Sequence, residues 1–432
     1  MRRLLIISPR FPPKNTPDEH RVRTSLPYFE KYGWDPTVLC LTPETTDGVD
    51  DPMLLKSVLS GTRLVRVPAW RESICRKFGF GHLDYRCLLP LYQAGCRLLS
   101  SEQFDLIYFS TTAFLTFVLG PRWKRIYGSK VVYDFQDPWY TGTNSIYDPT
   151  NAPGGWFKYQ VSQMISSQAE PYALRAADHV ISVSEGYIRD LSSRYSWLSP
   201  EKFSVIPFGA ASLDHEILRR AGIQQHIFEK NGKYLRWVYV GRGGPDINPV
   251  LSVFFQQLAR LKQSMPDLKD HLRVYFVGTN YSPAHRTFKV VEPLASQYGL
   301  SDIVIEHSER IPYFEALSLI RDSDAVLLVG SVSADYVASK LFNCVLSKKP
   351  VLALFHARSM VSQIAPMFGN IFLASFQSAP DELTFCETVA RGLNWLIKGT
   401  IDDKDFTSIL HPFTAEYLAA RQCAIFDRLF QV

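Results

Sequence analysis

Residues 236–244 have the sequence RWVYVGRGG, in which a short β-rich run, Arg236–Val240, leads directly into the glycine-rich turn Gly241–Gly244. An apolar helical pattern begins soon afterwards, near Pro249. A strand, a glycine-rich turn and a helix start bring backbone N–H groups and the positive end of a helix dipole to one point, which favours phosphate. Glycine also serves any tight βα turn, so this segment alone predicts a parallel α/β unit and leaves phosphate binding open.

The same alternation of β-rich runs and helical patterns continues on both sides of this segment. It predicts parallel sheets covered by helices on both faces. The expected strands are Leu4–Ser8, Thr37–Leu41, Leu64–Val67, Leu106–Ser110, Val131–Phe135, Val180–Ser184, Ser204–Pro207, Arg236–Val240, Val274–Val277, Ile303–Glu306, Ala325–Val329, Val351–Leu354 and Ile371–Leu373. The fold class is therefore α/β, with two doubly wound, Rossmann-like sheets.

The length of the chain indicates two domains, because 432 residues exceed the size at which one hydrophobic core stops growing. Residues 208–234 have no strand pattern, and a helical pattern over 414–430 is followed by no strand. We predict an N-terminal domain over 1–210, a linker over 211–234, a C-terminal domain over 235–412, and a C-terminal helix over 413–432 that crosses back to the N-terminal domain. Two such domains are expected to face a cleft, where ligands usually bind.

Composition narrows the classes of partner. The formal charge of +5 is a mild basic excess that suits an anionic ligand or membrane surface but falls short of a nucleic-acid-binding footprint. Seven cysteines occur without metal-ligand spacing, which indicates reduced thiols in the core. The apolar run after Arg3 stops at Pro9 and is too short for a signal peptide, and Ala113–Leu119 is far below the roughly 18 residues of a membrane helix. We therefore expect a cytoplasmic protein.

A second group of candidate residues lies in Ser333–Asn343, after the predicted strand Ala325–Val329. We expect a helix to start near Val337, with Ser339 and Lys340 in its first turn. A lysine is electrostatically unfavourable there, unless an anion sits in front of it. One charge pair about 4 Å apart is worth roughly 4 kcal/mol at an effective dielectric of 20. The alternative is a solvated surface lysine.

These segments resemble the retaining GT-B glycosyltransferases, in particular glycosyltransferase family 4, which uses nucleotide sugars. The resemblance covers nearly the whole chain. It is carried by Ser8–Pro13 with His20–Arg23 and Gly33–Leu39, by Val132–Trp139, Ile181–Glu185 and Val205–Gly209, and by Tyr239–Arg242. It implies a GT-B architecture and a donor diphosphate bound by Arg242.

The sequence departs from the family's paired-glutamate motif, which has two acidic residues eight apart, the second seven residues before a proline. Counting back from Pro350 gives Asn343 and Asp335. In the family the second glutamate accepts hydrogen bonds from the donor ribose. Asn343 can still accept through its amide oxygen, but without charge. Asp335 keeps a carboxylate with a shorter reach to the sugar.

The roles implied for the donor side follow from the charge that develops in glycosyl transfer. As the bond from C1 to the diphosphate stretches, Arg242 and Lys340 stabilise the leaving oxygens, with Asp335 as the third expected catalytic residue. The remaining expected donor-binding residues are Gly241, Gly243, Ser339 and Asn343. The resemblance implies retention of configuration by a hexosyl-type transferase, a UDP- or GDP-linked donor as substrate, and no metal or other cofactor.

For the acceptor we predict Asp134, Asp137, His20, Arg21 and Arg23. Both aspartates fall at the carboxyl end of a parallel strand, where ligands meet such sheets, although an Asp-x-x-Asp before Pro-Trp also serves turns and caps. The arginines suit an anionic acceptor, but at i and i+2 on a helix only one of them is expected to point into the cleft. The histidine is equally compatible with loop packing.

Residues 70–99 mix basic side chains with aromatic and aliphatic ones. Such a surface could dock on an anionic membrane to reach a lipid-linked acceptor. The alternative is an ordinary amphipathic helix that covers the sheet.

The sequence as a whole predicts a glycosyltransferase that builds a surface polysaccharide or glycolipid. One alternative is a nucleotide-sugar epimerase or hydrolase of the same architecture, for which the chain offers few carboxylates. Another is a non-catalytic nucleotide-sugar-binding or scaffold protein. Asn343 favours that alternative, whereas Arg242 and Lys340 argue against it.

Overall fold

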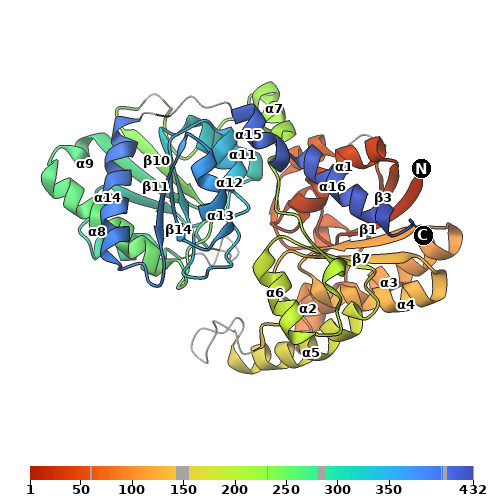
Figure 1. The fold of residues 1–432 in the computed structure, drawn as a ribbon. Coiled ribbons are helices and arrows are strands. Elements are labelled where there is room, and N and C mark those ends of the chain that lie inside the picture. The colour runs from red at the N-terminus through yellow and green to blue at the C-terminus, as the bar shows by residue number, and fades with distance from the viewer. Residues whose placement is uncertain are drawn as a thin grey trace. The chain divides into compact units, whose positions relative to one another are not determined.

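The computed structural model describes residues 1–58, 61–142, 155–230, 232–280, 288–399, 401 and 406–431. The chain divides into two compact units (Figure 1). Unit 1 comprises residues 1–208 and 415–432, and unit 2 comprises residues 209–414. These boundaries lie within two residues of the predicted ends of the N-terminal domain and the start of the C-terminal helix.

Unit 1 is built on a seven-stranded sheet in which every neighbouring pair of strands is parallel. The strand order is β5-β3-β1-β6-β7-β8-β9, so the order reverses between β1 and β6. The strands are β1 (Arg2–Ile7), β3 (Trp34–Leu41), β5 (Arg63–Val67), β6 (Leu106–Ser110), β7 (Lys130–Phe135), β8 (His179–Ser182) and β9 (Phe203–Val205). A two-stranded antiparallel pair, β2 (Lys14–Asn15) and β4 (Val49–Asp50), lies outside this sheet.

Alternate side chains of β1 enter two different cores, because successive residues of a strand point to opposite faces. Leu4 and Ile6 pack with α1 and α16, and Leu5 and Ile7 pack with α3, α4 and α5. Figure 1 shows helices on both sides of this sheet. The helices of unit 1 are α1 (Glu19–Phe29), α2 (Glu72–Cys75), α3 (Leu83–Ser101), α4 (Leu119–Tyr127), α5 (Trp156–Leu174), α6 (Glu185–Arg194) and α16 (Ala415–Arg428).

The C-terminal helix α16 belongs to the core of unit 1, as predicted. The ring of Phe426 lies 5.5 Å from Trp34 and 5.3 Å from Tyr108, centroid to centroid. Asp427 pairs with Arg2 at 2.7 Å. The last segment of the chain therefore completes the first unit.

Unit 2 repeats the architecture with a six-stranded parallel sheet in the order β12-β11-β10-β13-β14-β15. The strands are β10 (Leu235–Val240), β11 (Leu272–Val277), β12 (Val304–His307), β13 (Ala325–Val329), β14 (Val351–His356) and β15 (Ile371–Phe376). The helices are α7 (Ser212–Ala221), α8 (Asn248–Ser264), α9 (Leu268–His271), α10 (Glu292–Ser296), α11 (Tyr313–Asp322), α12 (Leu341–Leu346), α13 (Met360–Ile364), α14 (Leu383–Lys398) and α15 (Phe406–Leu410). The two doubly wound sheets predicted from the sequence are confirmed.

Residues 211–234 are part of unit 2, whereas the sequence predicted a separate linker there. They include α7, whose Asp214 accepts a hydrogen bond from Tyr313 Oη at 2.9 Å. Farther along, the carbonyl oxygen of Ile223 accepts hydrogen bonds from Ser318 Oγ at 2.9 Å and from Arg321 at 3.0 Å. A helix with few apolar residues resembles a polar linker in sequence, and only its contacts assign it to the unit.

Two of the expectations drawn from composition can be compared with the structure. All seven cysteines are free, and five of them are buried. Burial raises the pKa of the Cys40 thiol to about 12, which keeps it protonated. In the described part of the chain, no helix is long and apolar enough to span a membrane.

We predict that Gly95→Ala destabilises unit 1 by roughly 1–3 kcal/mol, because a Cβ at this position of α3 would lie 2.2 Å from Trp123 in α4. Trp123 is fully buried, and its ring packs against those of Tyr92 and Phe109. The free energy of unfolding in urea is the measurement. Gln93→Ala, at an exposed position of the same helix, is the control and should have little effect. Equal stability of the two variants would contradict this account of the α3–α4 contact.

Candidate functional site

The strand order of unit 2 reverses between β10 and β13, and ligands of doubly wound sheets bind outside the carboxyl ends of the strands at such a point. Arg242 follows β10, and Lys340 lies in the connection that leaves β13. Backbone hydrogen bonds join the loop after β10 to the end of β11 and to the loop after β13. Gly241 N donates to Val277 O at 2.9 Å, Gly243 N to Thr279 O at 2.8 Å, and Val332 N to Asp246 O at 3.0 Å. The topology therefore brings the two predicted cations to one place.

The ammonium group of Lys340 is enclosed by the end of β10. Its Nζ donates to Val240 O at 2.6 Å and lies 4.8 Å from the centre of the Tyr239 ring. The side chain as a whole is partly exposed. Burial lowers the pKa of Lys340 to about 8, and the positive charges of Arg242 and Arg310 act in the same direction. Lys340, Arg242 and Arg310 together make this point strongly positive, which favours the binding of an anion.

Gly241 makes the position of Lys340 possible. A Cβ on Gly241 would lie 1.8 Å from Lys340 Nζ, so any other residue would displace the ammonium group. The backbone of Gly241, at φ +152°, also disfavours a side chain. Gly243 is similarly confined, because its Cβ would meet Val290 Cγ2 at 2.6 Å. Both predicted glycines therefore serve a close approach rather than a turn alone.

Arg242 is held in a fixed orientation by Asp246, four residues later. Its Nη1 and Nη2 donate to the two carboxylate oxygens at 2.7 and 2.6 Å. The same hydrogen bonds raise the pKa of Arg242, so the guanidinium remains charged. The Tyr336 ring lies 5.6 Å away. Asp246 engages two of the five N–H groups of an arginine, and the others can contact a phosphate.

The helix predicted to start near Val337 begins at Leu341, so that prediction is wrong. Lys340 occupies its N-cap position, and Ser339 lies in the turn before it. Helix α12 is short, and its N-terminus is set by the turns that follow β13. Lys340 is therefore positioned by its contacts with the end of β10 more than by the helix.

Asn343 lies in the first turn of α12, where its Nδ2 is 3.4 Å from Tyr313 Oη. Tyr313 in turn donates to Asp214, so Asn343 is linked to α11 and α7. Asp335 lies in the loop between β13 and α12, and its backbone N donates to Ser333 Oγ at 3.3 Å. Position 343, where the sequence analysis expected an acid from the family pattern, thus has an amide that is linked through Tyr313 to the buried carboxylate of Asp214.

In unit 1 the structure brings Asp134 and Arg21 together, but inside the protein. Asp134 is fully buried, and its Oδ2 accepts from Arg21 Nε at 3.1 Å and from Ser110 Oγ at 2.7 Å. The other end of Arg21 donates to the carbonyl oxygens of Ile206 and Pro207 at 2.5 and 2.8 Å. The pair therefore joins α1 to β7 and to the segment Ile206–Pro207 after β9. The sequence had instead predicted that these residues face an acceptor.

Arg23 is also fully buried, with Nε 3.2 Å from Glu19 and Nη1 2.7 Å from Ser57. Its Nη2 lies 2.8 Å from His20 Nδ1. The expectation that one arginine of α1 faces a cleft does not match this arrangement, in which both are buried. Of the five residues predicted for the acceptor, Asp137 is exposed and His20 is partly exposed.

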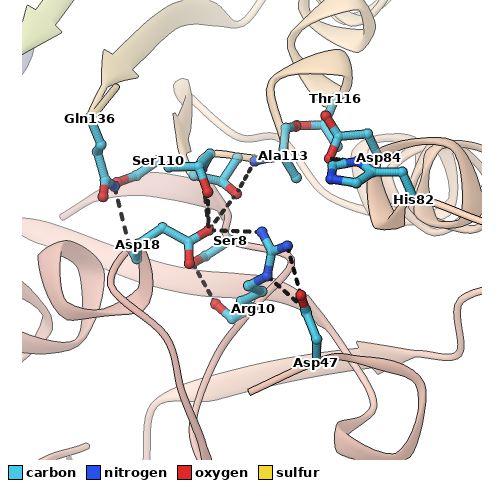
Figure 2. A network of polar contacts seen from close by, with 12 residues as sticks. Ser8, Arg10, Asp18, Asp47, His82, Asp84, Ser110, Ala113, Thr116 and Gln136 are labelled. Atoms are coloured by element: carbon cyan, nitrogen blue, oxygen red, sulfur yellow. Dashed lines mark hydrogen bonds and ion pairs between the residues drawn. The ribbon is translucent and has the colours of Figure 1, made fainter. Parts of the chain in front are cut away.

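A polar network that was not predicted from the sequence lies at the carboxyl ends of β1 and β6, where the order of this sheet reverses (Figure 2). Arg10 lies between Asp47, at 2.8 Å, and Asp18, at 3.4 Å. Asp18 Oδ2 also accepts from the hydroxyl groups of Thr111 and Thr112 at 3.0 and 3.2 Å. Although burial opposes it, the charges of the two carboxylates raise the pKa of Arg10. Arg10 comes two residues after the end of the predicted strand Leu4–Ser8, and this position is the signal that could have identified it.

His82 and Asp84 extend this edge at the start of α3 (Figure 2). His82 Nδ1 lies 3.2 Å from Asp84 Oδ1, and this hydrogen bond raises the pKa of His82. Among the described residues, no group of three or more His, Cys, Asp or Glu side chains is placed to hold a metal ion. The expectation of a metal-free reaction remains a prediction.

Comparison with known proteins agrees with this architecture. Residues 19–210 match the family model of Glycosyltransferase Family 4, which spans unit 1 from α1 to its boundary. No curated protein sequence matches the chain. The two Rossmann-like sheets and this match together define the GT-B glycosyltransferase fold.

Three solved structures illustrate the likeness. HepE from Anabaena, in complex with UDP and glucose, has a TM-score of 0.57 at 14% identity, over 99% of this chain and 100% of that one. A UDP-forming α,α-trehalose-phosphate synthase from Burkholderia xenovorans has a TM-score of 0.62 at 13% identity, over 100% of both chains. A protein from Listeria monocytogenes named as a candidate UDP-N-acetylglucosamine 2-epimerase has a TM-score of 0.52 at 13% identity, over 100% of this chain and 97% of that one. At these identities the likeness establishes the fold alone.

We predict that Lys340→Met raises the stability of the ligand-free protein at pH 7. The folded-state pKa of Lys340, about 8, lies below the ordinary value of 10.5, so the unfolded state binds the proton more tightly and the charge opposes folding below pH 8. Removing it relieves up to about 3 kcal/mol, less about 1 kcal/mol for the lost hydrogen bond to Val240.

The measurement is the melting temperature at pH 7, with Lys398→Met, at an exposed position, as the control. In the wild type, this lysine's contribution to stability should increase as the pH rises from about 8 to 10.5. A lower melting temperature of Lys340→Met than of the control would show that the lysine stabilises the fold.

Proposed function

We propose that the protein is a glycosyltransferase that moves a sugar from a nucleotide-diphosphate donor to a glycan or lipid-linked acceptor. The observation that carries the proposal is the pair of cations, Arg242 and Lys340, at the point where the strand order of unit 2 reverses. Such a position is where doubly wound sheets bind nucleotides. The solved structures with UDP or UDP-linked names support a uridine nucleotide, and a guanosine nucleotide is the alternative.

The chemistry of transfer explains why a cation pair is required. Negative charge grows on the diphosphate oxygens as the bond to the sugar C1 breaks, and preorganised cations stabilise it without reorganisation. Arg242 is already fixed by Asp246, and Lys340 by Val240 and Tyr239. An anion bound here also favours the protonated form of Lys340. We therefore assign the leaving-group stabilisation to these two residues.

The finer assignments are part of the same proposal. We propose retention of configuration by a hexosyl-type enzyme, without a metal, in the synthesis of a surface polysaccharide or glycolipid on the cytoplasmic side of a membrane. Asp335 and Asn343 are assigned to the donor sugar and ribose, together with Ser339, Gly241 and Gly243. Asp214, linked to Asn343 through Tyr313, supplies a carboxylate near the position where the family pattern expects one.

For the acceptor side we keep Asp137 and His20, which retain some exposure. Asp134, Arg21 and Arg23 are assigned to shaping this edge of the sheet, because their polar groups face protein partners. The Arg10 network and the His82–Asp84 pair are added as acceptor-side candidates.

A nucleotide-sugar epimerase is the second candidate, favoured by the fold match to the Listeria protein. A non-catalytic nucleotide-sugar-binding protein is a third, favoured by Asn343 in place of an acid. Both would bind the nucleotide. Only the transferase would release the nucleoside diphosphate in proportion to a glycosylated acceptor.

We predict that UDP or GDP stabilises the full-length protein, whereas Gly241→Ala and Lys340→Met abolish the effect. A ligand at 100 times its dissociation constant adds about 2.7 kcal/mol, or roughly 5–10 °C in melting temperature. Gly241→Ala removes no charge: its Cβ would displace Lys340 Nζ, and the backbone at φ +152° also disfavours a side chain there. Thermal shift with UDP, GDP and ADP is the measurement, and Lys398→Met should respond like the wild type. Failure of every nucleotide to raise the melting temperature would remove the support for an enzyme of this class.

We predict that nucleotide affinity falls as the pH rises through about 8, because Lys340 must be protonated to attract the diphosphate and its pKa lies near that value. Between pH 7 and 9.5 the charge of a terminal phosphate, with its pKa of about 6, changes little. Isothermal titration calorimetry in buffers of different ionisation enthalpy should detect proton uptake on binding above pH 8. Affinity independent of pH over this range would assign the phosphate contact to Arg242 alone.

A further inference from the structure

An exposed apolar surface lies between β5 and α3 of unit 1. Its four large apolar side chains are Trp70, Ile74, Phe78 and Phe80, with 50, 54, 73 and 54% of their surface exposed. We refer to residues 70–80 as the 70–80 surface. Exposed large apolar side chains gathered in one short segment mark an interaction site.

The 70–80 surface has a fixed conformation. Arg86, itself buried, donates to Trp70 O and to Gly81 O at 3.0 Å each, and so holds both ends of the segment. Between these ends, Cys75 is buried, and Gly79 at φ +82° closes the helical turns by donating to Arg76 O at 3.2 Å. The apolar side chains are thus held outward by a folded element.

The neighbouring residues of this surface are basic. Arg71, Arg76 and Lys77 alternate with the apolar side chains, and Glu72 is the one acidic residue of the segment. Glu72 pairs with Arg76. Across the described residues, Arg71 and Lys77 form no ion pair, and both are exposed. Two uncompensated cations thus flank exposed aromatic rings.

Exposed aromatic rings beside unpaired cations favour an anionic lipid bilayer as the partner. A bilayer interface accepts aromatic and aliphatic side chains at the level of the headgroups, and anionic lipids attract the adjacent cations. A protein partner or a second copy of the chain would also cover apolar rings, but the charge complementarity points to an anionic lipid surface.

The structure also narrows the region. The sequence suggested residues 70–99 as one membrane-facing stretch, but Leu83, Cys87 and Leu91 are buried in the core of unit 1. Arg86 is buried and structural. Four of the five exposed large apolar side chains of residues 70–99 lie in the 70–80 surface, and the fifth is Leu89 in α3.

We propose that the 70–80 surface docks unit 1 on an anionic bilayer and that the acceptor is a lipid-linked glycan. The segment follows the carboxyl end of β5, the edge of the parallel sheet that also carries the Arg10 network, and His82 comes two residues after Phe80. An acceptor with a polar head and a lipid anchor uses both features. The choice of acceptor rests on the proposed transferase function, whereas the docking does not.

The test is co-sedimentation of the full-length protein with vesicles at low salt. The wild type should bind vesicles that contain both phosphatidylglycerol and phosphatidylcholine, and this binding should weaken as the salt concentration increases. It should not bind vesicles of phosphatidylcholine alone. Ile74→Ser with Phe78→Ser should weaken the affinity at least roughly tenfold. Arg71→Gln with Lys77→Gln should weaken it about 25-fold, at about fivefold for each cation.

The matched control is Leu383→Ser with Lys269→Gln, which removes an exposed apolar and an exposed basic side chain from unit 2 and should bind vesicles like the wild type. Every variant should keep the UDP thermal shift. A missing UDP shift in the wild type would count against the transferase and leave the vesicle result standing. The docking is overturned if the wild type does not sediment with the anionic vesicles, if the 70–80 variants bind as well as the control, or if they only convert a dimer to a monomer.

Discussion

The contact between the Lys340 ammonium group and the end of β10 is the interaction on which the proposed donor site depends. It joins the two loops at the strand-order reversal of unit 2, and it exists because Gly241 has no Cβ. A carbonyl oxygen and an aromatic face replace only part of the water around the charge, so its pKa falls. Without an anion the lysine opposes folding, and with one it contributes to binding. Such a cost is expected where function, rather than stability, sets the residue.

Unit 1 shows the opposite electrostatic arrangement at the equivalent edge of its sheet. Its buried arginines, Arg21 and Arg23, have carboxylate partners in Asp134 and Glu19 and further hydrogen bonds to protein oxygens. A buried ion pair persists only when its remaining donors are also satisfied. These charges therefore fix α1 on the sheet, whereas Asp137 and His20, the more exposed residues, are the ones we propose for the acceptor. Charged side chains thus stabilise the fold at this edge of unit 1, whereas in unit 2 we propose that they bind a ligand.

Hydrogen bonds from a buried arginine also fix the 70–80 surface, but there they hold apolar side chains in an exposed position. Its rings are as large as those of the core but are held outward by Arg86, which satisfies the carbonyl groups at both ends of the segment. Exposed rings oppose solubility, so a folded element that presents them indicates a partner.

The pattern of residues along the chain was enough to predict the alternation of strands and helices, the two sheets and the return of the C-terminal helix, and it pointed to the cations Arg242 and Lys340. These depend on local periodicity and on short spacings, which a single chain displays directly. Other features became clear only from the three-dimensional contacts. These are the start of α12 at Leu341, the place of residues 211–234 in unit 2, and the burial of Arg21, Arg23 and Asp134. The Arg10–Asp18–Asp47 network and the exposure of residues 70–80 belong to the same group. Burial and pairing depend on residues far apart in the chain, and a charged residue has the same sequence pattern whether it meets a ligand or a buried carboxylate.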